Sequence, residues 1–235
     1  ITQIIKICPE ADYDFNALID NEALPVTQWL RQIYSHRDYN WDFHAITSSS
    51  EFKPDISFLQ SFIDKDLNWE YLSSQDLGNV WNDGAFLYQL SMNSDIRERI
   101  NWNFLSSLKE FPLDKQLFMT LPLEQLNWSC LSKRRKIIEY LDILQSLVDW
   151  KAISSNPAFN ITDNSLLNRY KDFLDWYVIC NRNDFVFSKY IINTFADYID
   201  WDLASRAITI DFDEELVRLY EDRWNWSALI ANKAF

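Results

Sequence analysis

Glycine is nearly absent from this chain, with two residues among 235. Sandwiches, barrels and nucleotide-binding α/β folds use glycine at tight turns and in phosphate loops, because glycine tolerates backbone conformations that strain other residues. A chain with so little glycine must turn at Asn, Asp, Ser and Pro instead. The composition therefore favours helices joined by short capped corners, and no Gly-x-Gly-x-x-Gly motif, P-loop or nucleophile elbow is present.

Metal-ligating and nucleophilic side chains are scarce as well. The three cysteines, Cys8, Cys130 and Cys180, are far apart and odd in number, which is typical of reduced thiols in a cytoplasm-like compartment. No Cys-x-x-Cys or His-x-x-x-His motif accompanies the two histidines, His36 and His44, so no zinc site is predicted. No cysteine is paired with a base, and we predict no catalytic residue, no metal and no cofactor.

Long apolar runs are also missing, and no stretch of about 18 apolar residues could cross a bilayer. The formal net charge is −13. An acidic surface repels phosphate backbones and anionic lipids, so direct binding to nucleic acid or to a membrane is disfavoured. Hydrophobic residues make up 48% of the chain, enough to build a core, and we expect a folded cytoplasmic protein.

Tryptophan, in contrast, is abundant and recurs at regular intervals. Each recurring Trp follows Asn or Asp, as in "DLNWEYLSS" and "RINWNFLSS", and the spacing is near 25 residues. Such fixed-period similarity indicates a repeat array. We call these positions the anchors, and there are nine of them: Phe15, Trp41, Trp69, Trp102, Trp128, Trp150, Trp176, Trp201 and Trp226.

Each anchor is predicted to start a helix. Asn and Asp are preferred N-caps because their side-chain oxygens accept N–H groups of the first turn. An apolar residue precedes each cap and another follows it within the first turns, as Leu67 and Leu72 do around Asn68. This pairing is a hydrophobic staple. In the repeat that contains Trp41, the pattern places the cap at Asn40 and the following apolar residue at Ala45.

A second helix is predicted in each unit, because a Thr, Ser or Asp opens an amphipathic run such as "DEELVRLYEDR". The predicted caps of these second helices are Thr27, Ser57, Asp114, Thr162, Ser188 and Asp213. Two repeats differ from this pattern. Residues 133–149 indicate one longer helix with a minimal corner. The repeat from Trp69 to Trp102 is long, and its extra residues include both glycines and Trp81. This insertion is interpreted as a surface loop, with a binding loop as the alternative.

The predicted fold is an all-α solenoid of about nine two-helix repeats, forming a single array over residues 1–235. The wording of "DWKAISSNPAFNIT", residues 149–162, resembles short tryptophan-anchored helical repeats of some giant-virus and bacterial proteins. The resemblance covers almost the whole chain and implies a repeat scaffold, without implying an activity. Because the sequence opens in what reads as the tail of a second helix and stops after a first helix, we expect a fragment of a longer protein with further domains.

The first functional hypothesis is a non-catalytic scaffold or sensor module that binds a protein or peptide partner, the usual role of such arrays. One alternative is an acidic decoy that mimics nucleic-acid charge and blocks a DNA-binding protein; it requires carboxylates in rows along one face. Another is an enzyme with a site in the 75–90 insertion, which polar groups converging near Gly84 would favour. The candidate partner-binding residues are Trp81 and the only basic cluster, Lys133, Arg134, Arg135 and Lys136.

Overall fold

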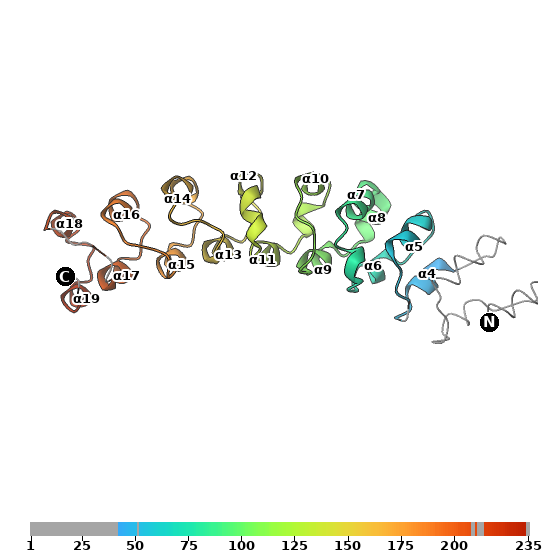
Figure 1. The fold of residues 1–235 in the computed structure, drawn as a ribbon, viewed down its shortest axis with the longest axis horizontal. Coiled ribbons are helices and arrows are strands. Elements are labelled where there is room, and N and C mark those ends of the chain that lie inside the picture. Colours follow the sequence, from blue (N-terminus) through green and yellow to red (C-terminus); the bar gives the residue numbers. More distant parts are fainter. Residues whose placement is uncertain (1–41, 51, 208–209, 211–213, 234–235) are drawn as a thin grey trace, which may run out of the picture. The chain divides into compact units, whose positions relative to one another are not determined.

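The computed structural model describes residues 42–50, 52–207, 210 and 214–233 (Figure 1). All regular structure in these ranges is helical, in α-helices of four to nine residues and three 3-10 turns. None of these helices is long and apolar enough to cross a membrane. The chain divides into two compact units, residues 1–127 and 128–235. Several predicted positions lie outside the described residues: Cys8, Phe15, Thr27, His36, Asn40, Trp41 and Asp213.

Among the described residues of the first unit, three helices start at an aromatic residue: α4 (Phe43–Thr47), α6 (Trp69–Leu72) and α9 (Trp102–Ser107). The elements that lead to the next anchor are α5 (Ile56–Ser61), α8 (Ser94–Arg99), α10 (Lys115–Phe118) and the 3-10 turn η2 (Leu123–Gln125). The insertion contributes the 3-10 turn η1 (Gly78–Val80) and α7 (Gly84–Met92). Helix α4 packs on α6, and α7 packs on both α8 and α10.

In the second unit the same alternation continues. The anchor helices are α11 (Trp128–Leu131), α13 (Trp150–Ser155), α15 (Trp176–Cys180), α17 (Trp201–Arg206) and α19 (Trp226–Ile230). The elements between them are η3 (Arg135–Tyr140), α12 (Leu141–Leu144), α14 (Asn164–Tyr170), α16 (Lys189–Thr194) and α18 (Glu214–Leu219). Helix α13 packs on α15 and α17 packs on α19, so repeats adjacent in sequence are adjacent in space.

Six of the predicted caps of the anchor helices are confirmed. The side-chain oxygen of Asn68 accepts the N–H of Tyr71 at 3.0 Å, and Trp69 is the first helical residue. The staple residues Leu67 and Leu72 are both buried. The same capping bond, from a side-chain oxygen to the N–H three residues on, forms at Asn101, Asp149, Asp175, Asp200 and Asn225.

The anchor indoles pack between the helices. Trp69 and Trp102 are each 1% exposed and Trp176 is buried, whereas Trp226 on α19 is 44% exposed. Trp128, Trp150 and Trp201 are half-buried. The indole N–H also donates to the carbonyl five residues earlier, at 2.8–3.1 Å, which ties each of these anchors to the end of the preceding helix. This bond forms at Trp102, Trp150, Trp176, Trp201 and Trp226.

The first described anchor helix starts two residues later than predicted. Its N-cap is Asp42, whose carboxylate accepts the N–H of Ala45 at 2.9 Å, and its first residue is Phe43. The buried residues are Phe43 and Ile46, and Ala45 is exposed, so the predicted cap and apolar position are wrong. Two successive pairs, Asn-Trp and Asp-Phe, match the cap-plus-aromatic pattern, and the second one starts the helix. Phe43 lies 26 residues before Trp69, close to the common spacing.

Two of the predicted second-helix caps are confirmed, since Asp114 caps α10 and Ser188 caps α16. A third is displaced by one residue. Asp163, rather than Thr162, caps α14, because its carboxylate accepts the N–H groups of both Ser165 and Leu166.

Two further predictions about second helices are wrong. Helix α5 is capped by Asp55, whose carboxylate accepts the N–H of Phe58 at 2.7 Å, so Ser57 lies inside the helix. Residues 133–149 do not form one long helix: the 3-10 turn η3 leads into the four-residue α12.

The insertion is a packed helical element instead of a surface loop. Trp81 is 1% exposed, its indole N–H donates to the carbonyl of Gln75 at 2.9 Å, and its ring stacks with Phe86 of α7 at 6.5 Å between centroids. Trp81 therefore packs against α7. It is not a surface residue, and its role in partner binding stays a prediction.

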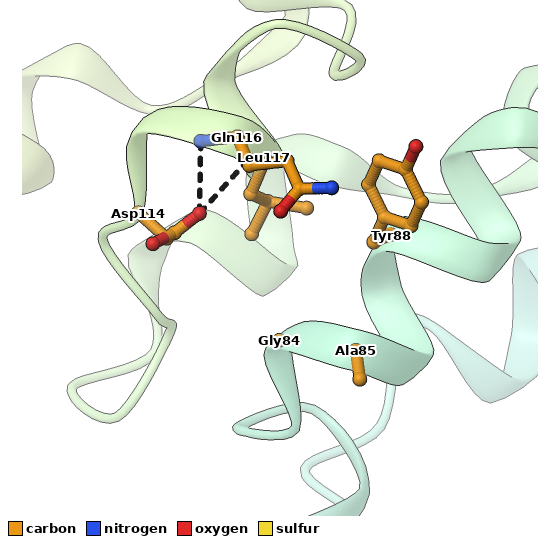
Figure 2. Close-up of a pocket in the computed structure, with 6 residues that line it drawn as sticks. All are labelled: Gly84, Ala85, Tyr88, Asp114, Gln116 and Leu117. Atoms are coloured by element: carbon orange, nitrogen blue, oxygen red, sulfur yellow. Dashed lines mark hydrogen bonds between the residues drawn. The ribbon is translucent and has the colours of Figure 1, made fainter.

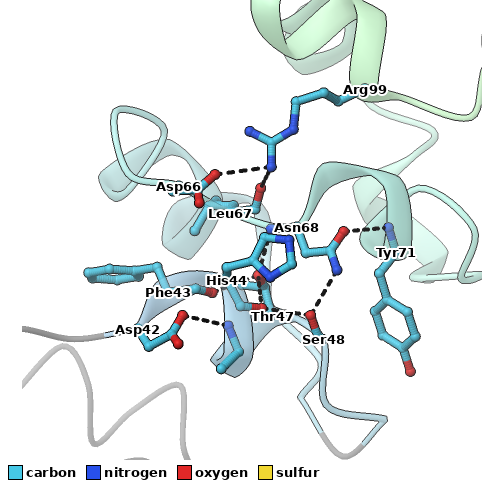
Figure 3. A network of polar contacts seen from close by, with 11 residues as sticks. Asp42, Phe43, His44, Thr47, Ser48, Asp66, Leu67, Asn68, Tyr71 and Arg99 are labelled. Atoms are coloured by element: carbon cyan, nitrogen blue, oxygen red, sulfur yellow. Dashed lines mark hydrogen bonds and ion pairs between the residues drawn. The ribbon is translucent and has the colours of Figure 1, made fainter.

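Buried hydroxyl groups join successive repeats, as Figure 3 shows for the first pair. The hydroxyl of Thr47 donates to the carbonyl of Phe43 and accepts the backbone N–H of Asn68, the next cap, both at 2.7 Å. We call this arrangement the hydroxyl latch. The side chains that accept the next cap N–H in this way, at 2.7–3.0 Å and with 0% exposure, are Thr47, Ser73, Ser106, Ser132, Ser154 and Ser205. In α15 Cys180 takes this place, and its sulfur accepts the N–H of Asp200.

Polar side chains add a second set of links. In the first unit Arg99 donates to the carbonyl of Leu67 at 2.6 Å (Figure 3). In the second unit the amide of Asn156 donates to the carbonyls of Ser132 and Arg134, both at 3.0 Å. One repeat later Arg182 spans the carbonyls of Ser154 and Asn156, and Asn232 spans those of Ser205 and Ala207.

Candidate functional site: a groove between α7 and α10

The insertion helix creates a groove where it packs beside α10, within the first unit (Figure 2). The groove has a volume of about 460 Å³. Its lining residues are Gly84, Ala85 and Tyr88 from α7, with Asp114, Gln116 and Leu117 at the start of α10.

Both helices begin beside this groove, and each of them begins at an aspartate N-cap. The carboxylate of Asp83 accepts the N–H of Phe86 at 2.8 Å and starts α7. The carboxylate of Asp114 accepts the N–H groups of Gln116 at 2.8 Å and Leu117 at 3.2 Å and starts α10. Asp114 lines the groove, and Asp83 immediately precedes the lining residue Gly84, so each of the two helices begins with a carboxylate at or next to the groove.

Small side chains keep the groove open and an aromatic ring forms its wall. A Cβ at Gly84 would lie 3.7 Å from the Cβ of Pro112, in ordinary contact, so glycine and alanine fit here and larger side chains would fill the space. Leu117 is buried beneath, and the amide of Gln116 extends toward the ring of Tyr88 (Figure 2). Within the described part of the chain, neither that amide nor the Tyr88 hydroxyl forms a hydrogen bond.

An apolar edge continues from the groove along the same two helices. The chain has two methionines, and both are here: Met92 at the end of α7 is 61% exposed and Met119 at the end of α10 is 80% exposed. The hydroxyl of Ser91 donates to that of Thr120 at 2.7 Å, which holds the two helix ends together. Met92 lies one turn after Tyr88 and so shares its face of α7. Methionine usually fills cores, so two exposed methionines on one seam are unusual.

The predicted basic cluster belongs to the second unit. Lys133 and Arg134 follow α11, and Arg135 and Lys136 are the first residues of η3; Arg134 is half-buried and the other three are exposed. Its role in partner binding stays a prediction.

In the described ranges, no three His, Cys, Asp or Glu side chains come together to hold a metal ion. His44 is exposed on α4, and Cys130 is half-buried. Burial raises the pKa of the Cys180 thiol to about 12, which keeps it protonated and unreactive near neutral pH.

Carboxylates do form a short row in the second unit, four residues before three successive anchors: Asp172, Asp197 and Asp222. The first two contact the next repeat, since the Tyr198 hydroxyl donates to Asp172 and Arg223 donates to Asp197 at 2.7 Å. Asp172 and Asp197 therefore contact the next repeat, yet all three carboxylates are exposed to solvent, and the decoy function stays a prediction.

From the sequence, the insertion, Gly84 and Asp114 could be singled out, but the other residues that line the groove could not. Ala85, Tyr88 and Gln116 are ordinary helix residues, and only the packing of α7 on α10 brings them together. The exposure of Met92 and Met119 depends on the same packing. No protein-family model, no curated protein and no solved structure matches this chain. The functional conclusion therefore rests on the chain's own geometry.

Proposed function

We propose that this chain is a helical-repeat scaffold, an α-solenoid, whose function is to bind a protein or peptide partner. The observation that carries the proposal is the hydroxyl latch, which recurs with one geometry from α4 to α17 within both units. A joint that is repeated in this way stacks each repeat on its neighbour. Stacked repeats give an extended surface, which proteins of this architecture use for binding.

The composition of the exposed surface supports binding. Aromatic residues and methionine are enriched at the centres of protein interfaces because they bury large areas at modest entropic cost. Here Tyr177, Tyr190 and Trp226 are largely exposed on anchor or second helices, as are the two methionines of the groove. With a net charge of −13, a basic partner is favoured over an acidic one.

Polar groups do converge near Gly84, the feature expected of an enzyme. However, the Oδ1 atom of Asp114 is occupied by two backbone N–H groups, and no base contacts the Tyr88 hydroxyl within the described residues. A nucleophile requires such a base. Unengaged amide and hydroxyl groups beside apolar walls are instead the usual make-up of a binding groove.

The proposal is tested by selecting ligands without prior choice of sequence. A phage library of random 12-residue peptides is passed over the immobilised 235-residue chain, with heat-unfolded chain as the control surface. We expect enriched peptides that bind the folded chain saturably, with one site, in isothermal titration calorimetry. Enrichment that is equal on unfolded chain, or no saturable binding at all, would contradict a peptide-binding function.

A further inference from the structure

We infer that the α7–α10 groove is the docking site for a short partner segment that carries an aliphatic side chain next to Lys or Arg. The inference rests on the proposed binding function and specifies its site and ligand chemistry. The groove volume of about 460 Å³ lies within the range of small-ligand pockets. It is large enough for one or two side chains and too small for a folded domain.

The apolar part of the ligand is specified by the floor and wall. Gly84 and Ala85 contribute almost no side chain, so the backbone of α7 and the buried Leu117 form an apolar floor. The ring of Tyr88 closes one side. An aliphatic side chain placed there would lose its contact with water on several faces, which is the main source of favourable binding energy for such groups.

The polar part is specified by groups that lack partners within the described chain. The Gln116 amide offers two donors and an acceptor, and the Tyr88 hydroxyl offers one donor and two lone pairs. Both lie at the groove, as Figure 2 shows. A peptide backbone carries matching N–H and C=O groups at every residue. These side chains can therefore orient a peptide without a charged anchor.

The charge of the ligand is specified by the two cap aspartates. Asp114 lines the groove and Asp83 is the residue before the lining residue Gly84, so both carboxylates lie at the N-terminal ends of the helices that form it. Lys115 is the one cation in the first turns of α7 and α10, which leaves an acidic excess. A Lys or Arg on the ligand would complement it and would raise the association rate most at low salt.

The apolar edge formed by Met92 and Met119 would extend the contact with the ligand beyond the groove. Met92 and Met119 project from the far ends of the same two helices and are largely exposed. Unbranched, polarisable methionine side chains adapt to ligands of different shape. A segment that starts at the aspartates can thus continue over an apolar surface.

The test uses the peptides selected on the intact chain and two kinds of variant. Ala85→Trp fills the groove, and Ala45→Trp places the same residue on the exposed first turn of α4 as its control. The double variant Asp83→Asn, Asp114→Asn removes the charges and keeps the caps, because Asn caps helices as well as Asp does. Its control is Asp175→Asn, which makes the same change at the cap of α15.

We expect the selected peptides to contain an aliphatic residue beside Lys or Arg. Ala85→Trp should weaken their binding at least about tenfold, as expected when a central pocket is lost. The double Asn variant should weaken it about three- to tenfold and flatten its salt dependence. Both controls should stay within about twofold, and circular dichroism should show that all variants remain folded.

The outcomes separate the two proposals. If the selected peptides bind the Ala85→Trp variant as tightly as they bind the original chain, the groove assignment is wrong while the scaffold function stands. If the enriched peptides are acidic, or if the double Asn variant binds them equally well, the charge assignment is wrong. If no peptide binds the folded chain saturably, the binding function itself fails.

Discussion

Replacing Ser106 with alanine removes a fully buried hydroxyl that links two repeats. This hydroxyl donates to the carbonyl of Trp102 at 2.7 Å and accepts the backbone N–H of Asn127 at 2.8 Å. Alanine leaves the Asn127 N–H without its acceptor, and an unsatisfied buried donor costs about 1–3 kcal/mol. Because this N–H is only partly buried, we expect a loss of about 1–2 kcal/mol in the free energy of unfolding.

The adjacent Ser107 supplies a matched control. It lies in the same helix and its hydroxyl donates to the carbonyl of Phe104 at 2.6 Å, but it is exposed and joins nothing in the next repeat. Ser107→Ala should change the free energy of unfolding by less than about 0.5 kcal/mol, as surface substitutions usually do. The pair therefore separates loss of the latch from loss of a serine in a short helix.

The assay combines urea unfolding, followed by tryptophan fluorescence, with amide hydrogen exchange. Exchange at Asn127 should accelerate in Ser106→Ala, because its N–H has lost its acceptor, and stay unchanged in Ser107→Ala. Equal unfolding midpoints for the two variants, with equal protection of the Asn127 amide, would refute the role assigned to the latch.

Trp102→Ala should destabilise the chain by about 3–5 kcal/mol and Trp226→Ala by less than half as much, since Trp102 is buried and Trp226 largely exposed; urea unfolding measures both. Cys180→Ser should keep the latch, and Cys180→Ala should lose about 1 kcal/mol in the same assay. In a Cys8→Ser, Cys130→Ser background, the Cys180 thiol should react with Ellman's reagent only on unfolding, because burial raises its pKa to about 12. Burial and the bond donated to Asp142 raise the pKa of Tyr170 from 10.0 to about 12. This stabilisation is present below pH 10 and is lost as the pH rises through about 12, so Tyr170→Phe should lose less stability across that window in alkaline unfolding.

The starts of the anchor helices from Trp69 to Trp226 could be predicted from the sequence because their determinants are local. Asn68 and Trp69 sit side by side, and the cap bond spans three residues. Local rules fail where two local choices compete. Near residue 42 either Asn-Trp or Asp-Phe could open the helix, and it is Asp-Phe that does so, with Phe43 and Ile46 buried. The spacing of 26 residues from Phe43 to Trp69 is the signal that could have resolved the choice.

The functions of the serines and of the groove could not be predicted in the same way. Ser106 and Ser107 are adjacent and identical in the sequence, yet Ser106 is buried and Ser107 is exposed. The packing of the next repeat sets this difference. The groove depends on α7 lying against α10, which are separated by two other helices along the chain. Contacts of this kind come from tertiary packing, and local periodicity does not encode them.

The latch also has a direction, and this gives the chain a preferred order of assembly. The acceptor of each joint belongs to the earlier repeat, where the hydroxyl of Ser106 is held by the carbonyl of Trp102, and the donor belongs to the later one, at Asn127. On a ribosome that adds about 5–20 residues per second, a repeat of some 25 residues takes about 1–5 s to emerge. The acceptor of each joint is therefore synthesised before its donor, so a joint can form as soon as the later repeat emerges.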